Sequence, residues 1–397
     1  MDRSNEYNDL QWAIGLNRCM LKIVGLWPPD SNNIRELLFS KLCRLFNIVI
    51  LIFVLTIPAL MSLIRVWGDM MSIIDNLQYT LPLLITILKV SIMWSKKKVL
   101  TSLINMITND WIKTKVEEER NVMLRYARIS RIFATCGGFM ILSTLIFGLI
   151  FPCFGLTIRH VTNLTDPGKP LPIQSYYLHD VSKSPQFELT LLIQGIGLTL
   201  SGVTYTGVDT FLGLLVLHIC GQMENLHMRL TNLGEKTNYK IALKYNVKDH
   251  VRLIRSIQII DNTFHLMLLG LFFLFGILFC LQGFLIINVV HQGSQLSLVQ
   301  LVSFLAANIC VLLHTCLYCT VGELLVTQSE RIHRAAYESV WYTIKPQIAR
   351  NLTLIMLRAN KSLRITAGKT FPLTMGTFCH LLKTSAGYIS VLLANQD

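Results

Sequence analysis

The chain has 397 residues, of which 52% are hydrophobic and only 15% are charged. Soluble domains carry about 25% charged residues, so this composition excludes a disordered chain and argues against a soluble two-domain enzyme. The net charge is +13, from 36 Lys and Arg against 23 Asp and Glu. A basic chain can contact nucleic acid, but membrane proteins also concentrate Lys and Arg on one side. The placement of the charges decides between the two.

Apolar runs poor in charge recur along the chain, and a membrane span takes about 20 mostly apolar residues. The runs are 45–64, 73–94, 132–158, 189–223, two within 262–322, and 370–394. The segment His291-Gln-Gly-Ser-Gln295 divides the longest run and is typical of a tight turn. Buried soluble helices are usually shorter than these runs. We therefore predict an all-α, polytopic membrane protein with seven transmembrane helices.

Lys and Arg alternate strongly between the segments that connect these runs. The segments 1–44, 95–131, 221–261 and 323–369 carry 30 of them, whereas the three intervening segments carry 4. Because Lys and Arg accumulate on the cytoplasmic side, the N-terminus is predicted inside and the C-terminus outside. The anionic inner leaflet explains the positive charge, so no nucleic-acid partner is expected. The sequon at Asn163 lies in a loop that this topology places outside the cell, and it is a candidate glycosylation site.

The strongest motifs lie in the last quarter of the chain. They are Tyr318-Cys-Thr-Val-Gly-Glu-Leu-Leu325, Arg334-Ala-Ala-Tyr-Glu-Ser-Val-Trp-Tyr342, Ile365-Thr-Ala-Gly368, Thr377-Phe378 and Leu382-Lys-Thr-Ser385. Upstream pieces fit in order: Gly25-Leu-Trp-Pro28, Leu171-Pro-Ile173, Ser184-Pro185, Gln194, Asp209 and Leu230. This series resembles the signature of the insect odorant receptor family.

The resemblance implies a ligand-gated, non-selective cation channel in which each of four subunits contributes its last helix to a central pore. It implies a volatile odorant as ligand, an olfactory co-receptor as partner in a heterotetramer, and the plasma membrane of a sensory neuron dendrite. The segment 221–261 is shorter than in the co-receptor, so the chain fits a ligand-tuning subunit. Two alternatives stay open. A gustatory-type channel is disfavoured by the sequence of the last helix, and a G-protein-coupled receptor is disfavoured by the predicted orientation. No cofactor, metal site or enzymatic motif is expected.

The resemblance places the ligand pocket in the outer halves of the second, third, fourth and sixth helices. The matching residues are Asn76, Tyr79, Thr80, Leu83, Ser143, Phe147, Ile150, Phe151, Thr199, Val203, Phe304 and Asn308. For each residue taken alone, core packing is a more common role than ligand contact. Asp75 at the rim is the one ionised residue of this zone, so an apolar, neutral or weakly polar ligand is expected.

The last run carries the expected pore. The resemblance assigns the extracellular gate to Val391, with Asn395 one turn further out, and an apolar ring can gate by dewetting. Lys383 would lie near the cytoplasmic mouth and could pair with Glu323 or a carboxylate of a neighbouring subunit. Packing of Val391 in a helix interface is the alternative.

The chain divides into a cytoplasmic segment 1–44, a bundle of six helices 45–322, cytoplasmic assembly helices 323–369, and the pore helix with its extracellular end 370–397. The last helix is thus expected to be divided into a cytoplasmic part and a pore-lining part. Tyr337 and Trp341 recur at helical spacing and are expected at subunit contacts, or alternatively on a membrane-surface helix. Asp209 is an intramembrane carboxylate, with either a functional or a structural role near the inner interface.

Overall fold

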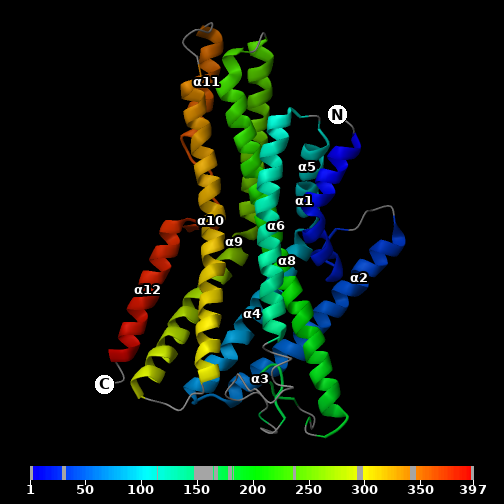
Figure 1. Cartoon of the computed structure of the whole chain (residues 1–397), viewed down its shortest axis with the longest axis vertical. Helices are drawn as coiled ribbons and strands as arrows, with labels where there is room; N and C mark the ends of the chain where they lie inside the picture. Colours follow the sequence, from blue (N-terminus) through cyan, green and yellow to red (C-terminus); the bar gives the residue numbers. More distant parts are fainter. Residues whose placement is uncertain are drawn as a thin grey trace.

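The computed structural model describes residues 3–28, 33–113, 115–146, 164, 169–177, 181, 183–235, 238–292, 298–339 and 346–394. The helices are α1 (Arg3–Ile23), α2 (Ile34–Val49), η1 (Ile50–Thr56), α3 (Ile57–Arg65), α4 (Met70–Ser95), α5 (Lys97–Ile112), α6 (Glu117–Leu145), α8 (Gln186–Thr231), η3 (Asn232–Glu235), α9 (Tyr239–Gln292), α10 (Leu298–Glu338), α11 (Pro346–Ala359) and α12 (Met375–Ala394). The one sheet of the described residues is an antiparallel hairpin of β1 (Thr366–Ala367) and β2 (Phe371–Pro372). The predicted all-α class is confirmed (Figure 1).

Five helices of the described part are long and apolar enough to cross a membrane. They are Ile34–Arg65, Met70–Ser95, Gln186–Thr231, Tyr239–Phe284 and Leu305–Glu338. The third predicted run, 132–158, starts in α6 and continues beyond the described residues. The seventh run corresponds to α12, which begins at Met375 rather than at residue 370 because β2 and Pro372 precede it. The total of seven spans stays a prediction.

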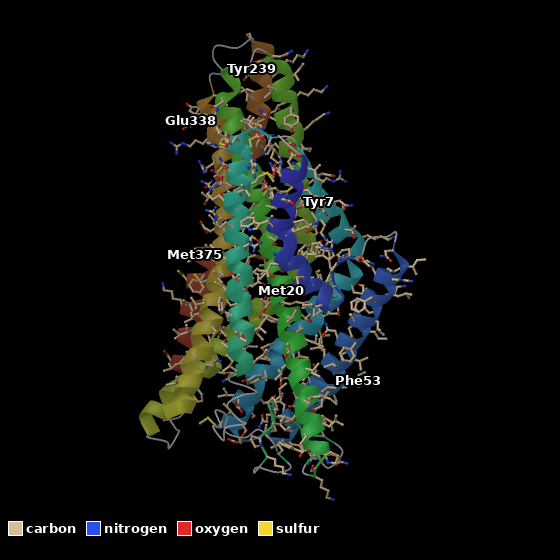
Figure 2. The ribbon with its side chains drawn as sticks, turned by 45° about the vertical axis from the view of Figure 1, so that its right-hand side comes forward. Tyr7, Met20, Phe53, Tyr239, Glu338 and Met375 are labelled. Carbon is tan, nitrogen blue, oxygen red and sulfur yellow. The ribbon has the colours of Figure 1, made fainter. Side chains whose placement is uncertain are left out.

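The longest helices exceed the thickness of a bilayer. At 1.5 Å per residue, the 46 residues of α8 span about 69 Å and the 54 residues of α9 about 81 Å, whereas the hydrocarbon core is about 30 Å thick. The basic segment 221–261 is therefore mostly helix, with η3 and a short turn between α8 and α9. Tyr239 and Glu338 lie toward the same end of the molecule, and Phe53 lies toward the other (Figure 2).

Helix α8 is the centre of the bundle and packs most extensively against α6 and α10. Every residue from Gly207 to Met223 is buried, as expected for a helix that is apolar on all sides. A Cβ atom added at Gly137 of α6 would overlap the Cγ2 atom of Thr206 on α8. This glycine lets the two helix backbones approach closely.

The turn Gly25–Trp27 fastens α1 to the bundle. Gly25 has φ +70°, and a side chain there would also lie 2.6 Å from the backbone nitrogen of Arg44, so only glycine fits. The Ser40 hydroxyl donates to the Gly25 carbonyl at 3.2 Å. Trp27 then packs edge-on against Phe211 of α8, with ring centroids 6.0 Å apart.

Helices α2, η1 and α3 form one continuous helical segment with a π-helical stretch before Pro58. Proline cannot donate a hydrogen bond to the carbonyl four residues earlier, and its ring crowds that carbonyl. The Val54 carbonyl accepts a hydrogen bond from the Tyr177 hydroxyl at 3.0 Å instead. Gln194 of α8, which is fully buried, donates to the same hydroxyl at 2.8 Å. The segment around residues 171–177 is thereby held against α3 and α8.

Candidate ligand cavity and the last helix

A cavity of about 390 Å³ lies between α4, α6, α8, α9 and α10. This volume falls within the range of about 300–1,000 Å³ typical of small-molecule sites. Its wall is mainly apolar and includes Tyr79, Pro82, Leu83, Phe133, Cys136, Met140, Ile141, Leu198, Ser201, Tyr205, Gly213, Val216, Leu274, Phe275, Leu278, Gln282, Ala307, Cys310, Val311, His314, Leu317 and Tyr318. Ile365 and Leu373, which flank the β-hairpin, close one end together with Val321 and Gly322.

Charged residues meet in the wall of this cavity. Lys89 of α4 lies with its Nζ atom 2.5 Å from Oδ1 of Asp209 on α8, and the Lys89 side chain is fully buried. Oδ2 of Asp209 lies 3.1 Å from Nε2 of His314 on α10. Asp209 and His314 both line the cavity. Three helices are thus joined by one polar cluster in an otherwise apolar interior.

Aromatic rings surround His314. Its ring centroid lies 5.6 Å from that of Tyr205, 5.5 Å from Phe275 and 5.2 Å from Tyr318. Lys89 also lies over the Tyr205 ring, with Nζ 3.2 Å from the centroid, a favourable cation–π geometry. The arrangement offers a mainly apolar, aromatic cavity with a polar cluster in its wall.

The structure places some of the predicted pocket residues in the cavity wall and others beside it. Tyr79 and Leu83 line the cavity. Thr80 and Asn76 are buried next to it, where the Thr80 hydroxyl donates to the Asn76 carbonyl oxygen at 2.6 Å and the Asn76 amide donates to the Ala59 carbonyl at 3.2 Å. These two residues fasten α4 to α3.

The remaining predicted pocket residues do not line the cavity or are not described. Ser143 and Thr199 donate to carbonyls of their own helices, Met140 and Gly195, at 2.9 and 2.8 Å. Val203 and Asn308 are half-buried and lie outside the wall. Phe147, Ile150 and Phe151 fall outside the described residues, and Phe304 is placed on α10 by its backbone alone. Ligand contact by any of the predicted residues stays a prediction.

The motif Ile365–Gly368 forms the hairpin that leads into α12. Oδ1 of Asp261 on α9 accepts hydrogen bonds from the amide and the hydroxyl of Thr366, both at 2.8 Å, and Oδ2 lies 2.6 Å from Nζ of Lys369. Gly368 has φ +63°, and its amide donates to the His265 carbonyl at 2.9 Å. The hairpin is thereby fixed to α9.

The motif around Gly322 and Glu323 on α10 holds the other side of this joint. A Cβ atom at Gly322 would overlap the carbonyl oxygen of Leu373. Oε2 of Glu323 accepts a hydrogen bond from the amide of Met375, the first residue of α12, at 3.2 Å. A carboxylate at a helix N-terminus is favourable. Met375 lies about midway along the molecule (Figure 2).

Helix α9 separates the cavity from α12. Its residues Phe275, Leu278 and Gln282 line the cavity. Interleaved with them, Gly276 faces Leu381, Cys280 lies 3.9 Å from the Ser385 carbonyl, and Gly283 faces Ile389, all three on α12. One helix therefore contacts the cavity with one face and the last helix with another.

The predicted pore and contact residues are only partly described. Val391 is 58% exposed on the surface of this single chain. Lys383 is exposed, and no ion pair involves it within the described residues; its suggested partner Glu323 caps α12 instead. Tyr337 is 65% exposed near the end of α10. Asn395, Trp341 and Asn163 fall outside the described residues.

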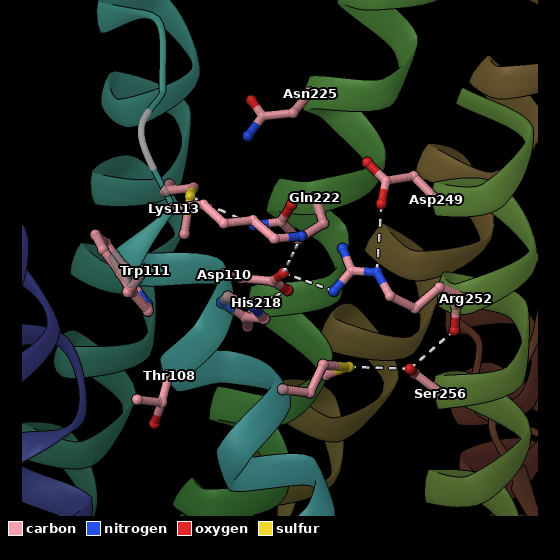
Figure 3. Close-up of polar contacts among 12 residues, drawn as sticks. Thr108, Asp110, Trp111, Lys113, His218, Gln222, Asn225, Asp249, Arg252 and Ser256 are labelled. Atoms are coloured by element: carbon pink, nitrogen blue, oxygen red, sulfur yellow. Dashed lines mark hydrogen bonds and ion pairs between the residues drawn. The ribbon is translucent and has the colours of Figure 1, made fainter. Parts of the chain in front are cut away.

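A second polar cluster joins α5, α8 and α9 (Figure 3). Oδ1 of Asp110 lies 2.6 Å from Nη1 of Arg252, and Oδ2 lies 3.2 Å from Nε2 of His218. Burial alone would raise the pKa of Asp110, but the hydrogen bonds and charges of His218 and Arg252 outweigh burial and lower it. Arg252 continues to Asp249 at 3.4 Å. None of these four residues lines the cavity described above, and the network joins three helices as a structural clamp.

The sequence alone did not bring Lys89, Asp209 and His314 together in one cluster. Asp209 is the one charge of the run 189–223, whereas Lys89 shares the run 73–94 with Asp75, and the two were not paired. Opposite charges isolated in different membrane runs are a signal of pairing. His314 gave no such signal, because one histidine in an apolar run is usually a satisfied core residue. The structure places an ionised Asp209 in the wall, whereas Asp75 had been expected as the one ionised residue nearby.

Comparison with known proteins points in one direction. The family model described as 7tm Odorant receptor matches residues 69–386. The chain is 25% identical over 243 residues to Odorant receptor 13a of Drosophila melanogaster, covering 56% of this chain and 57% of that protein. It is 24% identical over 384 residues to Odorant receptor Or2 of Anopheles gambiae, covering 91% of this chain and 96% of that one.

The fold is also similar to a solved structure. That structure is the insect olfactory receptor OR5 from Machilis hrabei in complex with eugenol, with a TM-score of 0.84 and 16% sequence identity, covering 98% of this chain and 99% of that one. The matches to Odorant receptor 13a and to Odorant receptor 10 of Aedes albopictus each span 57% of those proteins. The structural similarity establishes the fold.

Proposed function

The chain belongs to the 7tm Odorant receptor family, whose members are membrane receptors and not enzymes, and from this premise we propose that it is the odorant-binding subunit of a ligand-gated, non-selective cation channel. The partner is the olfactory co-receptor, in a heterotetramer. The chain crosses the plasma membrane of a sensory neuron dendrite several times, with the N-terminus inside and the C-terminus outside.

One observation carries the proposal: helix α9 lines the cavity and also packs against the last helix, α12. Ligand that fills the cavity meets Phe275 and Leu278 on α9, and the same helix packs on α12 through Gly276 and Gly283. Ligand at the inner end meets Leu373, which is two residues before α12. Because packed interiors transmit displacement rather than absorb it, occupation of the cavity can move α12.

The chemistry of the cavity fits a volatile ligand. Its wall is mainly apolar and aromatic, and its volume of about 390 Å³ suits a small molecule. Relative OR5 of Machilis hrabei binds eugenol, a small aromatic molecule. Tyr79 and Leu83 are the sequence-predicted contacts that fit this cavity, and the described part of α6 adds Met140 and Ile141.

Helix α12 is the pore-lining element of this proposal. A pore through lipid must be lined by helix, and the exposed Val391 leaves an apolar side chain on α12 for the gate. Lys383 lies eight residues before it, toward the inner mouth. The exposed Tyr337 at the end of α10, in the cytoplasmic assembly region 323–369, is available for subunit contacts.

Electrical recording tests the proposal. Cells that express this chain with an insect olfactory co-receptor are exposed to a panel of volatile compounds, and cells with the co-receptor alone serve as the control. The proposal predicts cation currents to compounds that the co-receptor alone does not detect. It also predicts that Val391→Ala changes the current at saturating ligand more than the half-maximal concentration. Currents that never depend on this chain would refute it.

Antibody labelling distinguishes the alternative of a G-protein-coupled receptor. A C-terminal epitope tag on unpermeabilised cells is accessible if the C-terminus lies outside, and hidden in the opposite orientation. A hidden tag would refute the predicted topology and with it the channel assignment.

A further inference from the structure

The inner end of the cavity contains more polarity than an apolar ligand requires. Lys89 and Asp209 are both at least nine-tenths buried, and their side chains lie 2.5 Å apart. Ionisable residues within a membrane bundle are costly and are retained where they pair or serve a function. Since the two charges cancel, the pair adds no net charge to the cavity.

The pair leaves little capacity for a further partner. The Lys89 ammonium faces Asp209, donates to the Tyr205 carbonyl at 3.3 Å and lies over the Tyr205 ring, which uses its three donors. Oδ1 of Asp209 faces Lys89, and Oδ2 faces Nε2 of His314. A ligand therefore cannot bind Lys89 without breaking this arrangement.

His314 is the member of the cluster with an unused hydrogen-bonding atom. In the imidazole tautomer that donates its Nε2 hydrogen to the Asp209 carboxylate, Nδ1 of His314 is a hydrogen-bond acceptor. None of the hydrogen bonds among the described residues involves Nδ1 of His314. The side chain is 20% exposed and lines the cavity, so the accessible space beside it is the cavity itself.

We propose that His314 is a polar recognition point of the cavity, and that the ligand is a neutral, largely apolar molecule with a hydroxyl group that donates to Nδ1. This inference rests on the proposed function, because it names the class of ligand for the same cavity. An ether or hydrocarbon of the same shape has no hydrogen to donate and leaves the acceptor buried and unpaired. Sites built for a hydroxyl discriminate strongly against analogues that lack it. A carboxylate does not fit this site, because an ionised carboxylate only accepts hydrogen bonds and has no hydrogen to donate to Nδ1.

A matched ligand series tests this inference with the complete receptor and its co-receptor. The series is a straight-chain primary alcohol, the methyl ether with the same number of heavy atoms, and the alkane. We expect the half-maximal concentration of the alcohol to be about tenfold lower than that of the ether, the value for one hydrogen bond to a buried site. Equal potency of the alcohol and the ether on the unmodified receptor overturns the inference.

The variant His314→Phe keeps a flat ring among Tyr205, Phe275 and Tyr318 but removes both nitrogens. It should abolish the preference for the alcohol while responses to the ether persist. The control is Cys310→Ala, one turn earlier in the same wall, which should shift the alcohol and the ether alike. A preserved preference in His314→Phe overturns the inference. If His314→Phe does not reach the cell surface, the ratio on the unmodified receptor decides alone.

A second readout separates this inference from the proposed function. The melting temperature of the purified receptor rises with any ligand that binds the folded state. A larger rise with the alcohol than with the ether, lost in His314→Phe, supports hydroxyl recognition even where no current flows. Absence of current with such binding would refute the channel proposal alone. Equal rises with both ligands would refute the inference alone.

Discussion

The buried pair of Lys89 and Asp209 gives the sharpest prediction of stability. The exposed fraction of the two side chains is 0% and 8%, so removing one partner leaves the other charge stranded in the membrane bundle. Breaking such a pair costs about 3–5 kcal/mol, a large share of the about 5–15 kcal/mol that stabilises a typical folded protein. We therefore expect Lys89→Met alone to reduce the folded, cell-surface fraction sharply.

The double variant Lys89→Met with Asp209→Asn supplies the control. It removes both charges and keeps an amide oxygen that accepts the hydrogen bond of His314, and replacing a whole buried pair is often neutral. Unfolding in detergent micelles, followed by size-exclusion of a fluorescently tagged protein, should rank the double variant close to the unmodified chain and well above Lys89→Met. If the single variant unfolds like the unmodified chain, or the two effects simply add, the charges do not stabilise each other as described.

The joint at the start of α12 and the second polar cluster make further predictions. Gly322→Ala should strongly reduce the current at saturating ligand, because its Cβ would overlap the Leu373 carbonyl oxygen just before α12. Recording together with a measurement of surface expression checks this. Asp261→Ala removes the acceptor of the hairpin and should destabilise the attachment of α12 by about 1–3 kcal/mol. Asn262→Ala removes one contact with Lys369 and should reduce both stability and current amplitude less than Asp261→Ala does. The pKa of Asp110 is lowered in the folded protein. Its contribution to stability is therefore complete above the usual carboxyl pKa and disappears as the pH falls through the pKa of the folded state. A melting temperature in detergent that does not change with pH in the acidic range would contradict this prediction.

Much of the fold was predictable because it depends on patterns that act over whole segments. The apolar runs poor in charge located the main helices, since a bilayer requires about 20 mostly apolar residues in succession. Helix ends were less predictable. The run 370–394 begins with a hairpin because Gly368 and Lys369 adopt positive φ values and Asp261 accepts their neighbours' hydrogen bonds. That contact joins residues more than a hundred positions apart, and no local pattern signals it.

The cavity was predictable in its general place but not in its residues. Apolarity along α8 does not say which face points inward, because Gly207–Met223 is buried on all sides. The resemblance suggested Thr199 and Val203, whereas the wall uses Ser201 and Tyr205. A rotation of 100° per residue separates neighbouring positions, so a shift of two residues moves a side chain to another face. Three-dimensional packing decides the rotation.

The signature motifs were recognisable from sequence, but their physical reason was not. Gly322, Glu323 and the segment Ile365–Gly368 meet at one joint, where α10 and α9 hold the start of α12. A glycine is needed for close approach, a carboxylate for the helix N-terminus, and a positive φ for the hairpin. The strongest sequence signal of the chain therefore lies at the connection between the cavity and the last helix.

Gly213 allows the most direct test of the claim that this cavity receives the ligand and opens the channel. Gly213 lies on α8 and lines the cavity, and a Cβ atom there would meet nothing within 4 Å. The variant Gly213→Leu therefore places a side chain in part of the cavity and also favours the helix. Gly15→Leu on α1, equally free of neighbours, is the matched control. Whole-cell recording with the co-receptor should show a large rise in half-maximal ligand concentration for Gly213→Leu, no change for Gly15→Leu, and normal surface expression of both. Unchanged ligand potency in a Gly213→Leu receptor that reaches the surface would contradict the account.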